Sequence, residues 1–133
     1  MSGKTGTVVC GESGLGPFGQ IVVADRHVLT ADQPETLGGR DTGPSPFQIL
    51  AAALGACTAQ TIRMYVQRKG WPLQRVSVTV AFREEQPKPV FDLAIALEGS
   101  LDQEQTARVL EIAGRCPVNR ALTEGAEISK RLV

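Results

Sequence analysis

The sequence predicts an α+β domain built from short strands, one long helix, a pair of strands and two shorter helices. Three observations carry this prediction: short segments rich in valine and isoleucine near the N-terminus, a central apolar stretch at helical spacing, and two later segments of alternating apolar and polar residues. Because the strands are grouped and do not alternate with helices, an α+β fold is favoured over a parallel α/β fold. A chain of 133 residues suits a single domain spanning residues 1–133.

The N-terminal part predicts a small antiparallel sheet. Its candidate strands are Thr5–Cys10, Gln20–Ala24 and His27–Ala31, separated by glycine-rich or Asp-Arg turn signals. The segment Gln33–Pro46 holds three prolines and three glycines, which predicts a loop. This loop connects the predicted sheet to the next element.

A long helix is predicted after this loop. Ser45 is a suitable N-cap and Pro46 a suitable first residue, while Gly70 and Pro72 stop the helix after about two dozen residues. Apolar and small side chains recur at helical spacing, which predicts that one stripe of the helix packs inward and shields Cys57 from water. The stripe consists of Leu50, Ala53, Leu54, Cys57, Thr61, Met64 and Tyr65.

Two strands are predicted next, because apolar residues alternate with polar or small ones over Val76–Phe82 and Phe91–Leu97. The proline-containing segment Gln86–Pro89 predicts the turn between them, so the strands are expected to be antiparallel.

The C-terminal part predicts two shorter helices and a last strand. Ser100 or Asp102 can cap the first of these helices, and Gly114 ends it. In the second, Cys116 takes the cap position, Pro117 the first turn and Gly125 the position after the end. Residues 128–132 are expected to add a final strand.

Composition excludes several function classes. Fourteen basic residues balance fourteen acidic ones and form no cluster, so no nucleic-acid partner is expected. The N-terminus lacks a secretory pattern and the apolar run Ile49–Ala59 is too short to span a bilayer, which predicts a cytoplasmic protein without a membrane partner. With three cysteines, no CxxC motif and one histidine, neither a disulfide framework nor a metal site is expected.

Two cysteines in unlike settings suggest thiol chemistry. Cys116 lies at a predicted helix N-terminus, where the positive end of the helix dipole favours the thiolate. Cys57 lies in an apolar helix, where its thiol needs a neighbouring cation to ionise. One could attack a substrate and the other resolve the product. Cys10 is interpreted as a strand residue, and the lone His27 as a turn residue.

Four ordered motifs carry a family resemblance. They are Gly-Gly-Arg-Asp-Thr-Gly-Pro-Ser-Pro-Phe from Gly38, Ala-Leu-Gly-Ala-Cys-Thr-Ala-Gln-Thr-Ile-Arg-Met-Tyr around Cys57, Arg-Lys-Gly-Trp-Pro-Leu from Arg68, and Cys-Pro-Val-Asn-Arg-Ala-Leu from Cys116. The chain resembles the OsmC/Ohr family of osmotically inducible and organic hydroperoxide resistance proteins. Within it, the Gly-Pro-x-Pro and Cys-Pro-Val motifs are similar to those of the OsmC-like redox proteins.

The resemblance implies a fold and an activity. It implies an intertwined homodimer with the helix Pro46–Lys69 in the interface and active sites built from both chains. Family members of known activity are thiol peroxidases that reduce organic hydroperoxides with no metal or organic cofactor. By the resemblance, Cys57 is the peroxidatic nucleophile and Cys116 the resolving thiol. Their disulfide is then reduced by an external dithiol.

The chain departs from the family pattern around the nucleophile. In the hydroperoxidases an arginine from the N-terminal sheet and a glutamate early in the long helix activate the cysteine. Here the matching stretch at residues 16–20 has no arginine, and Gln48 stands where the redox branch usually has its acid. Arg26 and Arg40 are the nearest substitutes by chain position. Asn119 replaces a histidine often found after Cys-Pro-Val.

Three functional classes therefore stay open. The first is a cysteine-based peroxidase that acts on organic hydroperoxides. The second is a thiol-disulfide or redox-sensing protein in which the same cysteines cycle without fast attack on peroxide. The third is a non-catalytic protein that binds an apolar ligand in the dimer cleft while both thiols stay reduced.

Overall fold

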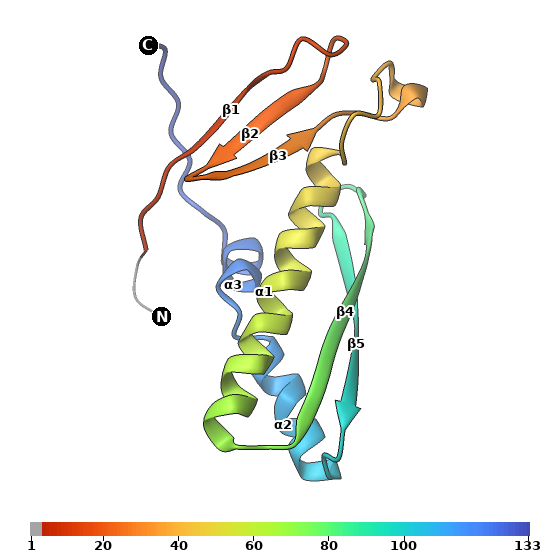
Figure 1. The fold of residues 1–133 in the computed structure, drawn as a ribbon, viewed down its shortest axis with the longest axis vertical. Coiled ribbons are helices and arrows are strands. Elements are labelled where there is room, and N and C mark those ends of the chain that lie inside the picture. The colour runs from red at the N-terminus through yellow and green to blue at the C-terminus, as the bar shows by residue number, and fades with distance from the viewer. Residues whose placement is uncertain (1–3) are drawn as a thin grey trace. The chain divides into compact units, whose positions relative to one another are not determined.

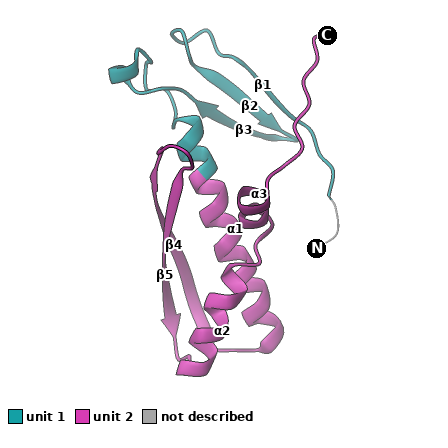
Figure 2. Ribbon diagram, turned by 180° about the vertical axis from the view of Figure 1, so that it is seen from behind, with its two compact units in different colours: residues 1–50 teal, residues 51–133 magenta. Residues whose placement is uncertain are grey.

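The computed structural model describes residues 4–133, which form two compact units. Of the described residues, those up to Leu50 form the first unit and residues 51–133 the second (Figure 2). The single domain expected from the length stays a prediction.

The first unit contains the expected three-stranded antiparallel sheet. Its strands are β1 (Val8–Glu12), β2 (Gln20–Ala24) and β3 (His27–Ala31), with β2 in the centre (Figure 1). The bounds of β2 and β3 match the prediction, whereas β1 begins and ends later than expected. Each residue of β1 pairs with one of β2, from Val8 opposite Ala24 to Glu12 opposite Gln20. Pairing with β2 therefore sets the end of β1, although Gly11 and Glu12 lack the apolar side chains that predict a strand.

One face of this sheet carries uncovered valines. Val9, Val23 and Val28 are opposite one another across the three strands, so their side chains share a face. Their exposed fractions are 61%, 38% and 62%. The residues of β2 that point to the other face are less exposed. The opposite face also carries exposed apolar side chains, among them Val8 (59%) and Leu29 (52%).

A buried carboxylate organises the loop that follows β3. Asp32 accepts hydrogen bonds from the backbone N–H of Gln33 (2.7 Å), the backbone N–H of Thr42 (3.0 Å) and the Thr42 hydroxyl (2.6 Å). These hydrogen bonds, led by that of the Thr42 hydroxyl, hold the pKa of the Asp32 carboxyl below its usual range. The predicted loop thus has a fixed structure, including a short 3-10 helix at Glu35–Leu37.

The long helix α1 spans Pro46–Lys69, as predicted. Ser45 and Gln48 form a reciprocal cap: the Gln48 N–H donates to the Ser45 hydroxyl, and the Ser45 N–H donates to Gln48 Oε1. Gly70, at a φ of 68°, ends the helix. By length and composition α1 could cross a membrane, because its most apolar window has a mean hydropathy of 1.3. The apolar part of the helix is therefore longer than the segment 49–59 that the sequence analysis judged too short to span a bilayer. A core helix of a soluble protein meets the same criterion.

The buried face of α1 differs from the predicted stripe. The buried residues are Ala51, Leu54, Gly55, Thr58, Ile62 and Val66. Of the predicted residues only Leu54 is buried, whereas Ala53 and Met64 are exposed and Cys57 is half-buried. Apolar and small side chains surround much of α1, so spacing alone could not identify the side that packs inward. The buried side is determined by the elements that contact it.

Those elements are a hairpin and a helix in the second unit. Strands β4 (Leu73–Arg83) and β5 (Val90–Gly99) pair antiparallel, which confirms the predicted hairpin with longer strands. The helix α2 spans Gln103–Ala113. The core of this unit consists of Ile62, Val66, Leu73 and Val109, against which Trp71, Val76, Ile95, Leu97, Leu101 and Ala113 pack.

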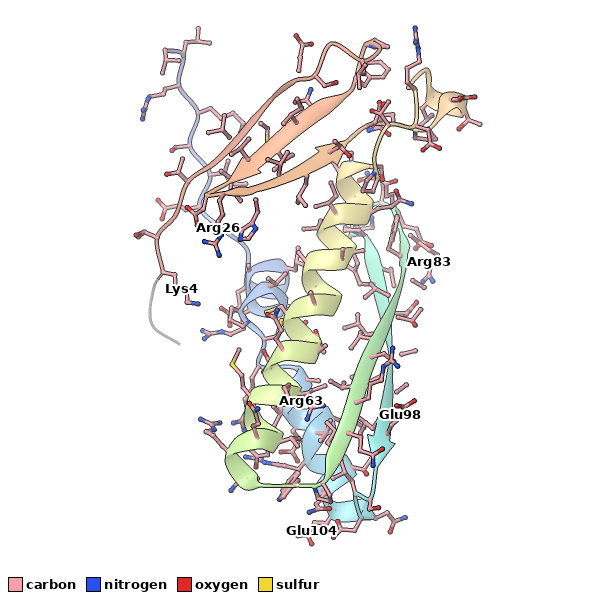
Figure 3. The ribbon with its side chains drawn as sticks, in the orientation of Figure 1. Lys4, Arg26, Arg63, Arg83, Glu98 and Glu104 are labelled. Atoms are coloured by element: carbon pink, nitrogen blue, oxygen red, sulfur yellow. The ribbon has the colours of Figure 1, made fainter. Side chains whose placement is uncertain are left out.

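Two polar or steric details fix α1 against the hairpin. A Cβ on Gly55 would lie 3.0 Å from Cγ2 of Val80, so the glycine lets β4 approach the helix closely. Arg63 donates to the carbonyl oxygens of Leu73 (2.9 Å) and Gln74 (3.2 Å), which ties α1 to the start of β4 (Figure 3).

The C-terminal helices follow their predicted signals. Asp102, and not Ser100, caps α2 in a capping box with Gln105, and Gly114 follows the last residue of α2. The helix α3 spans Pro117–Glu124 and is followed by Gly125.

The predicted last strand was wrong. Residues 125–133 adopt no helix or strand, and Ile128 is 77% exposed. A strand requires a partner backbone, and within residues 4–133 none pairs with this segment.

Candidate active site

Cys116 is the N-cap of α3, as its position before Pro117 predicts. Its Sγ accepts a hydrogen bond from the backbone N–H of Asn119 at 3.3 Å. The residue has no exposed surface. The sulfur thus replaces the oxygen of a usual capping side chain, and the partial positive charge of the helix N-terminus lies next to it.

Cys57 lies on α1, at the edge of its buried face. It is half-buried, which corrects the expectation that it would be largely shielded from water. The groups that act on its thiol include the Cys116 thiol, the backbone N–H of Val118 and the Thr61 hydroxyl. Helix α3 lies beside the middle of α1 (Figures 1 and 2), so both thiols and the first turn of α3 meet in one place.

Burial, followed by the interaction with Cys116, raises the pKa of the Cys57 thiol above its ordinary value. The backbone N–H of Val118 and the Thr61 hydroxyl act in the opposite direction, because they donate to the sulfur and favour its charged form. None of these principal interactions involves a cation. Cys57 is therefore protonated over a wider pH range than a free cysteine.

Asn119 holds the turn between α2 and α3. Its side-chain Nδ2 donates to the Gly114 carbonyl oxygen at 2.9 Å, and its backbone N–H donates to Cys116 Sγ. The residue that replaces the family histidine thus fixes the position of Cys116 and does not supply a second titratable group.

The other predicted site residues belong to the first unit. Gln48 engages in the cap of α1 with Ser45. Arg26 is exposed in the β2–β3 turn (Figure 3), and Arg40 is exposed in the loop after Gly39, where its side chain lies against Gly16. The structure brings Cys57 and Cys116 together, and the roles of Gln48, Arg26 and Arg40 in activating Cys57 stay predictions.

The second unit holds a cavity lined by residues of α1, β5, α3 and the turn before β5, and neither cysteine is among its lining residues. Its volume is about 600 Å³, within the usual range for small-molecule sites. Leu54 lies one turn before Cys57 on α1, and Asn119 contacts Cys116, so two lining residues neighbour the cysteines. The lining residues are Leu54, Lys88, Pro89, Phe91, Leu93, Asn119, Leu122, Thr123, Glu124 and Gly125.

Thr61 and the Val118 N–H were missed by the sequence interpretation as thiol partners. The spacing of Thr61, four residues after Cys57 on the same helix face, was the available signal. The Val118 contact depends on how α3 packs on α1, which no local pattern records. In the described part of the chain, residues 4–133, no group of three or more His, Cys, Asp or Glu side chains is arranged to hold a metal ion.

Comparison with known proteins places this site in a family. The family model described as OsmC-like protein matches residues 39–130, which include both cysteines. The chain belongs to the OsmC-like protein family. No curated protein is significantly similar in sequence to this OsmC-like chain.

Solved structures share the OsmC-like fold at low sequence identity. A putative osmotic stress induced and detoxification response protein from Psychrobacter arcticus has a TM-score of 0.77 at 18% identity, covering 91% of this chain and 90% of its own. An organic hydroperoxide resistance protein OsmC from Legionella pneumophila has a TM-score of 0.61 at 24% identity, covering 91% and 90%. The organic hydroperoxide resistance protein OhrB of Bacillus subtilis has a TM-score of 0.62 at 19% identity, covering 89% and 90%. The expected α+β fold with a long central helix is confirmed.

Proposed function

We propose that this protein is a cytoplasmic, cofactor-free thiol peroxidase that reduces organic hydroperoxides, with Cys57 as nucleophile and Cys116 as resolving thiol. The observation that carries the proposal is that the thiol of Cys57 on α1 and the thiol of Cys116 at the N-cap of α3 act on one another. Thiols bridge only when their backbones approach closely, so this interaction supports a disulfide between them. Family membership and hydroperoxide resistance proteins among the structural relatives support the same chemistry.

The proposed reaction uses Cys57 and Cys116 in turn. The Cys57 thiolate attacks one peroxide oxygen: an S–O bond forms, the O–O bond breaks, and the leaving alkoxide takes up a proton to become an alcohol. The Cys116 sulfur then attacks the sulfenic sulfur of Cys57, so that an S–S bond forms and the hydroxyl leaves as water. An external dithiol reduces this disulfide by thiol-disulfide exchange and is itself oxidised to a disulfide.

The cavity beside α3 suits the organic part of such a substrate. Leu54, Phe91, Leu93 and Leu122 supply its apolar lining. Burial of a hydrocarbon group against these side chains stabilises the complex by roughly 25 cal/mol per Å² of apolar surface. Hydrogen peroxide lacks that group, so an organic hydroperoxide is the expected preferred substrate.

The proposed functional form is a homodimer. The valine face of the sheet, formed by Val9, Val23 and Val28, is uncovered in the single chain. Ala52, Ala53, Ala56 and Met64 on α1 are also exposed. A second copy would remove these apolar surfaces from water. A partner subunit would also offer a second set of Arg26, Arg40 and Gln48 for activating Cys57.

A second candidate function is redox sensing by the same cysteine pair. The raised pKa of Cys57 favours it, because a protonated thiol attacks peroxide slowly at neutral pH. In that case the disulfide forms over a longer time and acts as a signal.

Stopped-flow oxidation distinguishes these functions. The fully reduced protein is mixed with cumene hydroperoxide or hydrogen peroxide, alongside the C57S and C116S variants. A peroxidase gives fast, organic-selective oxidation that C57S abolishes, while C116S reacts once and then stops turning over with a dithiol. Slow oxidation without preference for the organic peroxide contradicts the peroxidase and favours sensing. No oxidation of either cysteine leaves ligand binding in the cavity as the function.

A further inference from the structure

The helices α1 and α2 begin with the same kind of cap. A side-chain oxygen of Ser45 or Asp102 accepts a hydrogen bond from the backbone N–H of the third helical residue, at 3.2 and 2.8 Å respectively. That third residue is a glutamine in both helices, Gln48 and Gln105, and its side chain accepts a hydrogen bond from the backbone N–H of the cap residue. Two reciprocal hydrogen bonds thus hold the start of each helix.

Helix α3 begins differently. Its cap is the Cys116 sulfur, which accepts a hydrogen bond from the Asn119 N–H at 3.3 Å. Asn119 is again the third helical residue, but its side chain donates to the Gly114 carbonyl oxygen at 2.9 Å. Among the described residues 4–133, α2 therefore has a capping box, whereas α3 has a sulfur cap without one. Sulfur is a weak acceptor, and this one changes chemically when Cys116 is oxidised.

Packing contributes less to α3 than to the other helices. None of the residues 117–124, all of which the structure describes, is buried, whereas α1 and α2 both contain buried residues. The ion pair between Arg120 and Glu124 has an N–O distance of 3.6 Å and side chains that are 63% and 65% exposed. Exposed ion pairs contribute little to stability. Helix α3 should therefore open more readily than α1 or α2, and its stability depends on its cap.

Helix α3 also borders the parts of the site that must become accessible during a reaction cycle. Cys116, at its start, has no exposed surface, so an external dithiol does not reach this sulfur while α3 is closed. The cavity of about 600 Å³ is lined on one side by Asn119, Leu122, Thr123 and Glu124 of α3. Opening of α3 would expose the Cys116 sulfur and remove one wall of the cavity.

We propose that α3 is a redox-sensitive gate, which is closed while the Cys116 thiol caps it and opens when Cys116 forms a disulfide with Cys57. This inference rests on the proposed function, in which the two thiols are oxidised to a disulfide while the hydroperoxide is reduced to an alcohol and water. A disulfide fixes the dihedral angles around both sulfurs, so the Cys116 side chain turns toward Cys57 and its hydrogen bond from Asn119 weakens. The open helix admits the dithiol and releases the alcohol. Reduction restores the cap and closes α3.

Hydrogen exchange of backbone amides, measured by mass spectrometry on peptides that cover α3 and α2, tests this gate. The reduced protein is compared with protein oxidised by cumene hydroperoxide or by diamide, which takes up the two thiol hydrogens as the disulfide forms. Cys116→Ala removes the cap from the reduced protein, whereas Cys116→Ser keeps a capping oxygen. Helix α2, with its own cap at Asp102, is the internal control. Disulfide mapping verifies the oxidised state.

We expect the amides of α3 to exchange about fivefold faster in reduced C116A and in the oxidised wild type than in the reduced wild type, as for the loss of a typical helix cap. Exchange of α3 in C116S, and of α2 in every sample, should stay within about twofold of the reduced wild type. Unchanged or slower exchange of α3 in either the oxidised protein or C116A overturns the proposal. An equal acceleration of α2 also overturns it, because it indicates a general loss of packing.

The two oxidants separate this inference from the proposed function. If cumene hydroperoxide reacts slowly but the disulfide formed with diamide accelerates exchange in α3, the peroxidase proposal fails while the gate stands. If peroxide reduction is fast and α3 exchanges alike in the reduced and oxidised protein, the peroxidase stands and the gate fails. If neither oxidant forms the Cys57–Cys116 disulfide, both proposals fail.

Discussion

The two compact units differ in what they bury. The second unit has its own apolar core, in which Ile62, Val66 and Val109 are fully or almost fully removed from water, and it contains both cysteines of the candidate site. The first unit is a three-stranded sheet whose valine face stays exposed. A three-stranded sheet needs a packed apolar face for stability.

Because of this difference, the candidate thiol chemistry lies in the second unit and the surface proposed for dimer assembly in the first. The two cysteines, Thr61, Val118 and the cavity beside α3 all lie in the second unit. The first unit contributes an organised loop, an uncovered sheet face and the arginines proposed as substitutes for the family's activating residue. The two cysteines are therefore positioned within one unit, and the first unit supplies the surface proposed for a second copy.

The largest expected loss of stability comes from a substitution in the core of the second unit. Ile62→Ala removes a fully buried side chain and should lower the free energy of unfolding by about 2–4 kcal/mol, because a cavity remains. Gln67→Ala, on the same helix but exposed, is the control and should cost less than about 1 kcal/mol. Denaturant unfolding measures both. An equal loss in Q67A would contradict the assignment of Ile62 to a packed core.

A substitution on the valine face of the first unit should change the free energy of unfolding less than Ile62→Ala does. It should mainly weaken the proposed dimer. Val28→Lys places a charge on the valine face and should weaken the proposed dimer more than about tenfold, because the charge would be buried without a partner. His27→Lys, whose side chain points to the other face of β3, should leave it intact. Sedimentation over a concentration series measures the dissociation constant. An unchanged V28K dimer would exclude the valine face as the interface.

Local signals in the sequence predicted most of the elements. Ser45, Pro46 and Gly70 determine where α1 begins and ends, and Cys116 and Gly125 determine the bounds of α3. These signals succeed because caps and glycine turns act through backbone groups a few residues away.

Longer-range features escaped prediction for physical reasons. The inward face of α1 could not be identified, because Ala53 and Met64 are as compatible with a core as Ala51 and Ile62 until β4, β5 and α2 are in place. The contact between Cys57 and the start of α3 depends on the same packing. The family resemblance named the pair, but only the fold brings the sulfurs together.

The central claim is that the second unit holds a complete thiol pair. Treating the reduced protein with one equivalent of cumene hydroperoxide and mapping its disulfides by mass spectrometry tests this most directly. We expect a Cys57–Cys116 bridge within each chain, with the exposed Cys10 left as a free thiol. Oxidation that stops at the Cys57 sulfenic acid, or that links Cys10 to either cysteine, would contradict the claim.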